Sequence, residues 1–147
     1  MKKLLFLLLM VGSGAWAAEG LVTMESPYDV TTTMDRLQET VTKAGFKVMA
    51  RVRHSQGAAK AGLELAPEEL LIFGKPKAGT LLMQSQATVG IDLPMKYLVW
   101  QDSQGRVRVA WNDPAWIARR HGIEDRTALV TKMQGALRKL AEQSLQP

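Results

Sequence analysis

Apolar positions recur every three or four residues in two long stretches of the chain, which predicts two amphipathic helices. The first begins after Asp29, a residue suited to capping, and ends at Gly45. The second begins after Asp125, which is also predicted to cap its helix. The buried stripes are predicted to contain Val30, Met34, Leu37, Val41 and Ala44 in the first helix and Leu129, Met133, Ala136, Leu137 and Leu140 in the second.

Between these helices the spacing changes to the period of two that is typical of strands. Residues 70–73 are apolar without interruption, residues 95–101 and 106–111 form a predicted hairpin, and 21–25 form a short strand. Residues 46–53 alternate. One face of this strand is predicted to bear Phe46, Val48, Ala50 and Val52, and the other Lys47, Met49, Arg51 and Arg53.

Shorter segments complete the order of elements. Small residues at 55–62 allow one or two helical turns capped by Ser55, Pro76 opens a helix, and residues 88–94 are predicted to be a loop. Asn112-Asp113-Pro114 is typical of a helix N-terminus. The order predicts the α+β class, as a two-layer sandwich whose antiparallel sheet has β-α-β(4)-α order and helices packed on one face.

The first seventeen residues have the three zones of a secretory signal peptide. Lys2 and Lys3 precede an apolar stretch from Leu4 to Val11, and the zone ends in Ala15-Trp16-Ala17. This stretch is shorter than the roughly 20 residues of a membrane-spanning helix, and no later segment is longer. We expect cleavage after Ala17, a periplasmic location, no membrane span and a single mature domain at 18–147. A short uncleaved anchor is the alternative.

The amino-acid composition excludes several kinds of chemistry and indicates which ligands the surface favours. The chain has no cysteine, which excludes disulfides, thiol catalysis and CxxC redox chemistry. Its 19 Lys and Arg against 14 Asp and Glu make it mildly basic, and these charges are scattered. Such a surface favours phosphate groups, anionic headgroups or acidic partners, and we expect no nucleic-acid binding. No motif implies a cofactor.

Several short motifs follow one another in the mature chain. They are His54 with Gly57-Ala58-Ala59-Lys60, Leu70 to Pro76, Gly79-Thr80, Gly90 to Pro94, Asn112-Asp113-Pro114, and Arg120-His121-Gly122. With these motifs, the segment from about Thr23 to Leu140 resembles the family called domain of unknown function 302. The resemblance implies a β-α-β(4)-α fold of the TATA-box-binding-protein-like sort and implies no reaction. Family members often carry Asn where this chain has Lys75, so that position is assigned no role.

The polar residues of these motifs lie at predicted strand ends and in the loops that follow, where rigid elements can hold side chains over an open surface. An imidazole beside a carboxylate in such a place can act as a general base. No spacing typical of a metal site is present, so no metal is expected. The residues predicted to line a small cleft are His54, Lys60, Asp92, Asn112, Asp113 and His121.

Structural roles compete with this interpretation. His121 precedes a helix-ending glycine and could contact free carbonyls, while Asn112 and Asp113 could serve as helix caps. Asp92 could bind loop amides, and Lys60 could be a solvated surface charge. His54, the sixth candidate, is divided evenly between a ligand contact and a structural hydrogen bond.

Three functions are compatible with the sequence. The first, which we favour here, is a periplasmic module that binds a polar or anionic small molecule in the predicted cleft. The second is an envelope interaction domain that docks on a partner protein through the sheet face bearing Lys47, Arg51 and Arg53. The third is a hydrolase or lyase in which His54 is the base and Asp92 orients it. The oligomeric state is left open.

Overall fold

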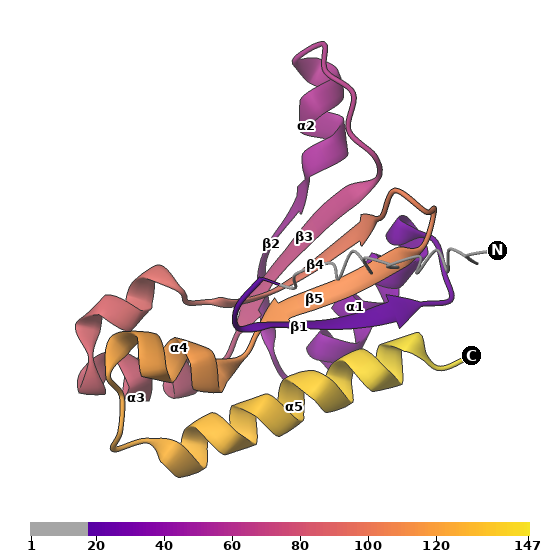
Figure 1. Ribbon diagram of the computed structural model, residues 1–147. Coiled ribbons are helices and arrows are strands. Elements are labelled where there is room, and N and C mark those ends of the chain that lie inside the picture. Colours follow the sequence, from indigo (N-terminus) through magenta and orange to yellow (C-terminus); the bar gives the residue numbers. More distant parts are fainter. Residues whose placement is uncertain (1–17) are drawn as a thin grey trace, which may run out of the picture.

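The computed structural model describes residues 18–147, and at their centre lies a five-stranded antiparallel sheet (Figure 1). The order across the sheet is β1-β5-β4-β3-β2. The predicted signal peptide lies outside the described residues. The strands are β1 (Leu21–Ser26), β2 (Lys47–Arg53), β3 (Glu68–Gly74), β4 (Met95–Gln101) and β5 (Val107–Asn112).

The long helices α1 (Val30–Lys43) and α5 (Thr127–Leu145) cover one face of this sheet (Figure 1). At one end of the sheet lie α3, the 3-10 helix η1 and α4, while α2 projects from the other end. The predicted α+β sandwich with helices on one face is confirmed. The shorter helices are α2 (His54–Lys60), α3 (Pro76–Ser85), η1 (Ala87–Ile91) and α4 (Pro114–His121). Helix η1 overlaps residues 88–94, which were predicted to be a loop, and so corrects that prediction.

Most of the core lies between the sheet and the two long helices. Four aromatic side chains, Phe46, Phe73, Tyr97 and Trp111, form a row with successive ring centroids 5.6, 4.8 and 5.5 Å apart. The Tyr97 hydroxyl donates a hydrogen bond to the Leu137 carbonyl at 2.6 Å, which ties α5 to β4. No helix within residues 18–147 combines the length and apolarity that crossing a bilayer requires.

Two of the predicted helix caps are present. Asp29 accepts a hydrogen bond from the Thr32 amide at 2.8 Å at the start of α1, and Asp113 accepts one from the Ala115 amide at 2.9 Å at the start of α4. Gly122 ends α4 in the left-handed conformation, with φ of 66°, which glycine adopts without steric cost. The local sequence therefore determines these ends.

Two other predicted caps are wrong. Helix α5 starts beyond Asp125, with Arg126 at its N-cap position and no capping side chain, and Asp125 instead accepts a hydrogen bond from the Ser85 hydroxyl. Ser55 does not cap α2 either, because its hydroxyl accepts a long hydrogen bond of 3.4 Å from the Glu68 amide. In both cases a contact with a distant segment replaces the local one.

A β-bulge in β2 changes which residues share a face. Val48 pairs with Phe73 but Ala50 pairs with Ile72, so Met49 is an extra residue. Beyond Met49 the predicted alternation is therefore inverted.

The bulge moves Arg51 and Arg53 to the helix-covered side, which corrects the predicted docking face. There Arg51 is 2.5 Å from a carboxylate oxygen of the buried Glu69 and also contacts Asp35. The positive charge that the sequence assigned to a docking surface is thus used within the fold.

The other side of the sheet, which we call the open face, carries no helix of the described residues (Figure 1). Directly paired residues of antiparallel strands point to the same side, so the register defines the rows of this face. Its central row crosses all five strands, and a second row lies on each side of it. The rows are Val52, Leu70, Leu98, Ala110 and Thr23; Glu68, Trp100, Arg108 and Glu25; and Ala50, Ile72 and Lys96.

Candidate functional site

Four polar side chains meet where η1 approaches the C-terminal end of α4, and we call them the α4-end cluster: Thr88, Asp92, Arg120 and His121. The His121 ring lies between two of them, with Nε2 at 2.6 Å from Asp92 Oδ2 and Nδ1 at 2.9 Å from Thr88 Oγ1. An ionised carboxylate only accepts, so Nε2 carries the hydrogen that is donated to Asp92. In the neutral ring Nδ1 then accepts from the Thr88 hydroxyl.

Arg120 completes the hydrogen bonding of the same carboxylate. Its Nη1 donates to Asp92 Oδ1 at 3.0 Å and to Oδ2 at 3.2 Å, and its guanidinium lies 5.6 Å from the centre of the Trp116 ring. The Asp92 and His121 side chains are only 11% and 8% exposed, against 49% for Arg120. The cluster is consequently a closed network that ties η1 to α4.

Lys96 lies beside the cluster at the start of β4. Its Nζ donates to the backbone carbonyls of Asp92 at 3.1 Å and Pro94 at 2.7 Å. Burial lowers the pKa of Lys96, and the Asp92 charge opposes this shift. This ammonium therefore holds the turn between η1 and β4.

The Asn112 and Asp113 pair begins α4, at the same end of the sheet. Asn112 is the last residue of β5, opposite Leu21 of β1. Asp113 caps α4 and also accepts a hydrogen bond from the Gln134 side chain of α5 at 2.8 Å. Its carboxylate thus links α4 to α5, which agrees with the structural role that capping predicts.

The remaining candidates, His54 and Lys60, lie on α2 at the opposite end of the sheet. Arg53, directly before His54, pairs with Glu69, near the end of β4 that is far from Asp92. Figure 1 shows α2 on one side of the molecule and α4 on the other. The structure brings together Asp92 and His121, with Asn112 and Asp113 at the same end, and does not bring His54 or Lys60 to them.

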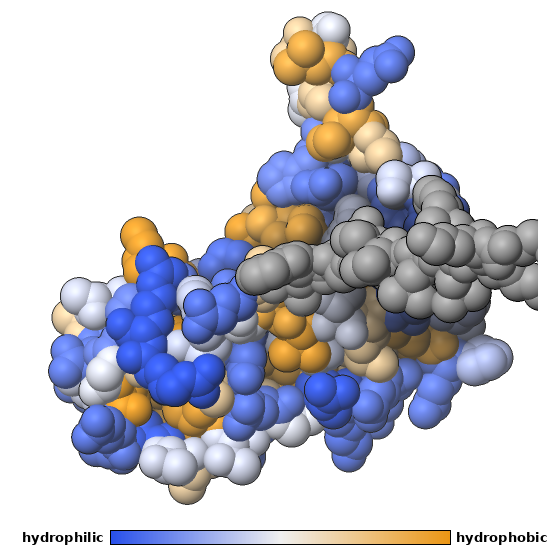
Figure 2. Space-filling model, in the orientation of Figure 1, coloured by the Kyte–Doolittle hydropathy of each residue, from blue (hydrophilic) through white to orange (hydrophobic). Residues whose placement is uncertain are grey.

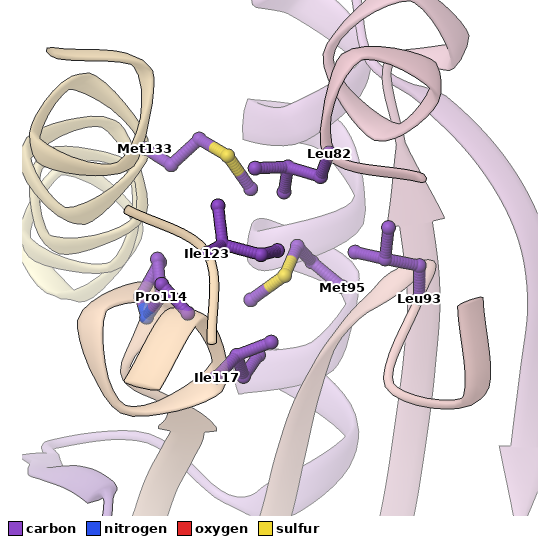
Figure 3. Close-up of a pocket in the computed structure, with 8 residues that line it drawn as sticks. Leu82, Leu93, Met95, Pro114, Ile117, Ile123 and Met133 are labelled. Carbon is purple, nitrogen blue, oxygen red and sulfur yellow. The ribbon is translucent and has the colours of Figure 1, made fainter. Parts of the chain in front are cut away.

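The cavity behind α4 is far smaller than a ligand-binding pocket. A small void behind α4 is lined by apolar side chains that converge from α3, α4, α5 and β4 (Figure 3). Its volume is about 10 Å³, close to the least that a single water requires. Its lining is Leu82, Leu93, Met95, Pro114, Ile117, Ala118, Ile123 and Met133.

The chemistry open to the cluster is correspondingly limited. Hydrogen bonds from Thr88 through His121 to Asp92 form a route along which a proton could move, but the void behind α4 is too small to hold a substrate beside it. Within residues 18–147, no three His, Asp or Glu side chains are grouped as a metal site would require. The hydrogen bonds that are present join η1 to α4, as those of a structural clasp do.

Three features of the structure were not assigned a role from the sequence. Thr88 and Arg120 complete the cluster, and Arg120 was present in a recognised motif beside His121. The third feature is the apolar open face. Its signal was available in the uninterrupted apolar run at 70–73, because a strand that is apolar on both sides needs both faces covered.

Similar proteins include Brucella proteins that are named ion channels, although the match covers only part of each. A protein named fluoride-specific ion channel FluC 1, from Brucella suis biovar 1 (strain 1330), is 48% identical over 104 residues, covering 71% of this chain and 41% of that protein. Fluoride-specific ion channel FluC 2, from Brucella melitensis biotype 1, has the same identity over 104 residues, and 38% of it is covered. The chain thus spans about two fifths of the length of these relatives.

A solved structure shares the fold. The crystal structure of an uncharacterized conserved protein DUF302 from Bacillus stearothermophilus superposes with a TM-score of 0.77, covers 86% of this chain and 99% of its own, and is 19% identical. The family model for domain of unknown function DUF302 matches residues 22–140, the segment that carries the motifs. The chain belongs to the DUF302 family.

Proposed function

We propose that this chain is an exported envelope protein that docks on a membrane-embedded partner through the open face of its sheet. The observation that carries this proposal is the apolar centre of that face, where Leu70, Ile72, Leu98 and Trp100 lie on neighbouring strands. Antiparallel strands with one solvated face usually alternate between apolar and polar residues. Strands β3 and β4 depart from that rule, which supports a covered open face.

Charged groups border this apolar centre. Lys96 lies on one side, and on the other side Arg108 Nη1 is 3.5 Å from a carboxylate oxygen of Glu25. An apolar centre with a polar rim is the usual arrangement of a protein interface, and Trp is prominent among residues that contribute most to binding. Fully burying a large apolar side chain contributes about 1.5–3 kcal/mol. Trp100 and its neighbours are therefore suited to anchoring a partner.

The relatives support the choice of partner. In the Brucella proteins, a segment similar to this chain is joined to a longer remainder, and the whole is named a fluoride-specific ion channel. Units of one chain contact each other through interfaces that resemble those between separate proteins. A separate copy of such a segment is accordingly expected to contact the same kind of unit. We take the partner to be a fluoride channel of the cell envelope, and export follows from the signal-like pattern at residues 1–17.

The other two functions have less support from the geometry. A small-molecule module needs polar groups with free hydrogen-bonding capacity, whereas the Asp92 carboxylate is already occupied by His121 and Arg120. A hydrolase or lyase with His54 as base and Asp92 as its orienting group requires the two to touch, and they lie at opposite ends of the sheet. Among the described residues 18–147, the open face is a large sheet surface on which no helix packs.

The test is a binding measurement with the part of the Brucella suis relative that this chain does not match, embedded in lipid nanodiscs. We expect the purified chain to bind these nanodiscs and Trp100→Glu to weaken binding at least about tenfold, since a charge would be buried in the apolar centre. Ile91→Glu is the matched control, because Ile91 is 77% exposed and lies in η1, outside the open face.

Equal binding by wild type and Trp100→Glu would show that the open face is not the docking surface. Absence of binding to the channel nanodiscs, relative to empty ones, would refute the choice of partner. A thermal melt of each variant guards against misfolding, since Trp100 is half-buried and does not belong to the core.

A further inference from the structure

The segment between β2 and β3 forms an arm that projects beyond the end of the sheet (Figure 1). We define the arm as residues 54–67, which comprise α2 and the extended return to β3. Among the helices and strands, β3 is the one with which α2 makes its main contacts. Figure 2 shows hydrophobic surface on this arm, away from the core.

The arm lacks the support that short helices normally need. Helix α2 spans the seven residues His54–Lys60 and buries none of them. Isolated helices shorter than about 12 residues are marginal in water, and helices in proteins gain most of their stability from packing. Leu63 and Leu65, in the return segment, are 66% and 47% exposed. Both the helix and the leucines would therefore be stabilised by a partner surface.

The arm carries an open hollow and an exposed leucine side chain that could enter such a hollow on a partner. An open hollow of about 490 Å³ lies between α2 and the return segment, and arm residues alone line it. Leu63 is one of its lining residues. A Cβ atom added at Gly57 in α2, or at Gly62 just beyond it, would have no atoms of residues other than its chain neighbours within 4 Å. Another backbone could therefore approach this part of the arm closely. The lining residues are Ser55, Ala59, Leu63, Glu64, Leu65 and Ala66.

The charges of the arm indicate which partner fits. Lys60 and Glu64 have opposite signs, and neither forms an ion pair within residues 18–147. A surface that bears both signs can satisfy itself when two copies meet about a two-fold axis, because each Lys60 then faces the other copy's Glu64. A lipid surface fits less well, since Glu64 lies between the two leucines and α2 has no continuous apolar face.

We infer that two copies of this chain associate arm to arm, with Leu63 of each entering the hollow of the other and Lys60 paired with Glu64 across the axis. Such an interface is small, because one arm contributes fewer residues than the 20–30 a side of a standard-size interface. We expect a weak dimer, with a dissociation constant of about 10–100 µM. The surface is separate from the open face, so the inference does not depend on the proposed channel partner.

A charge exchange tests the pairing directly. Sedimentation of the purified protein between about 1 and 300 µM is expected to show reversible dimerisation. Lys60→Glu and Glu64→Lys each place like charges across the axis, and each is expected to weaken the dimer at least about tenfold. The double variant Lys60→Glu with Glu64→Lys restores opposite charges and is expected to recover most of the wild-type affinity.

Two further variants define the surface. Leu63→Asp puts a charge into the hollow and is expected to abolish the dimer, whereas Ile91→Asp, at a residue that is also exposed but distant from the arm, is expected to leave it intact. A wild type that stays monomeric throughout the concentration range overturns the inference. So does a dimer that Leu63→Asp leaves unchanged. If Trp100→Glu alone dissociates the dimer, the self-association belongs to the open face, and both the arm inference and the assignment of that face to a channel fail together.

Discussion

The two ends of the sheet differ in how far their side chains are satisfied by contacts within the fold. At the α4 end, Asp92, His121 and Arg120 satisfy one another, and the side chains behind them pack around a void of about 10 Å³. At the arm, no residue of α2 is buried and the leucines that follow face solvent. The motif residues Asp92, Arg120 and His121 thus lie where the structure is closed, whereas the motif residues His54 and Lys60 lie on the exposed arm. This contrast teaches that polarity within a recognised motif does not by itself locate a binding site.

The largest expected difference between the two ends comes from a pair of leucines. Leu82 lines the void and is 3% exposed, while Leu63 in the arm is 66% exposed. Leu82→Ala is expected to lower the free energy of unfolding by about 3 kcal/mol, because the enlarged cavity adds to the lost transfer free energy. Leu63→Ala, measured at micromolar protein, is expected to change it by less than about 0.5 kcal/mol. Urea denaturation of both variants makes the comparison, and equal losses would mean that the arm is packed.

The next largest expected difference in stability concerns two carboxylates, Asp92 at the α4 end and Glu64 in the arm. Asp92→Ala removes the acceptor for both His121 and Arg120 and leaves the His121 ring, 8% exposed, without that partner. We expect a loss of about 2 kcal/mol. Glu64→Ala is the control from the arm, where the side chain is exposed, and its expected effect is within about 0.5 kcal/mol. If Asp92→Ala melts like wild type, the cluster does not stabilise the fold and its groups are free for another role.

Local sequence patterns were sufficient to predict the helices and strands. They were insufficient to predict the contacts between elements that are distant in the sequence. The period of α1, the Asp113 cap and the Gly122 stop follow from side chains within a few residues, so the sequence predicted them. The bulge at Met49 has no local mark, because one extra residue in a strand is recognised only against the strand it pairs with. That single residue turned Arg51 from the predicted docking face into the pairing with Glu69.

The candidate site shows the same limit. Asp92 and His121 were both selected from motifs, and their contact at 2.6 Å joins segments far apart in the sequence. His54 was selected on the same grounds and lies at the other end of the sheet. Which of several loops converge is decided by the register of the strands that carry them, and register is a property of the assembled sheet.

Helix caps allow a finer version of the comparison, because α4 has one and α2 has none. Asp113→Ala removes the bond from the Ala115 amide and the link to Gln134, and we expect a loss of about 1–2 kcal/mol. Arg53→Ser offers α2 a capping hydroxyl at its N-cap position, and we expect no more than a few tenths of a kcal/mol in global stability, because α2 buries no residue and is expected to open without the core. Amide hydrogen exchange in α2, measured beside the melts, should slow only for Arg53→Ser. A large global gain would show instead that α2 unfolds together with the sheet.

The smallest expected effect is a difference in pH dependence. Burial lowers the pKa of Lys96 from its ordinary value of 10.5, so between the lowered value and 10.5 the unfolded chain binds more protons than the folded one. The contribution of Lys96 to stability therefore rises with pH. It is greatest above pH 10.5 and declines as the pH falls through the lowered pKa. In Lys96→Met this rise with pH is expected to be absent, whereas in Lys60→Met, which changes a solvent-exposed residue of the arm, it is expected to persist.

Urea midpoints recorded between about pH 8 and about pH 10 measure this difference. Burial raises the pKa of Tyr97, so Tyr97 lowers stability with rising pH only above the ordinary tyrosine pKa of 10.0, outside this pH range. The ammonium of Lys96 is only partly withdrawn from water, so the expected change in slope is modest. Parallel slopes for wild type and Lys96→Met would mean that solvent reaches this ammonium despite its two carbonyl partners. The α4 end would then be less closed than the distances around Asp92 indicate, and its contrast with the arm would be one of degree.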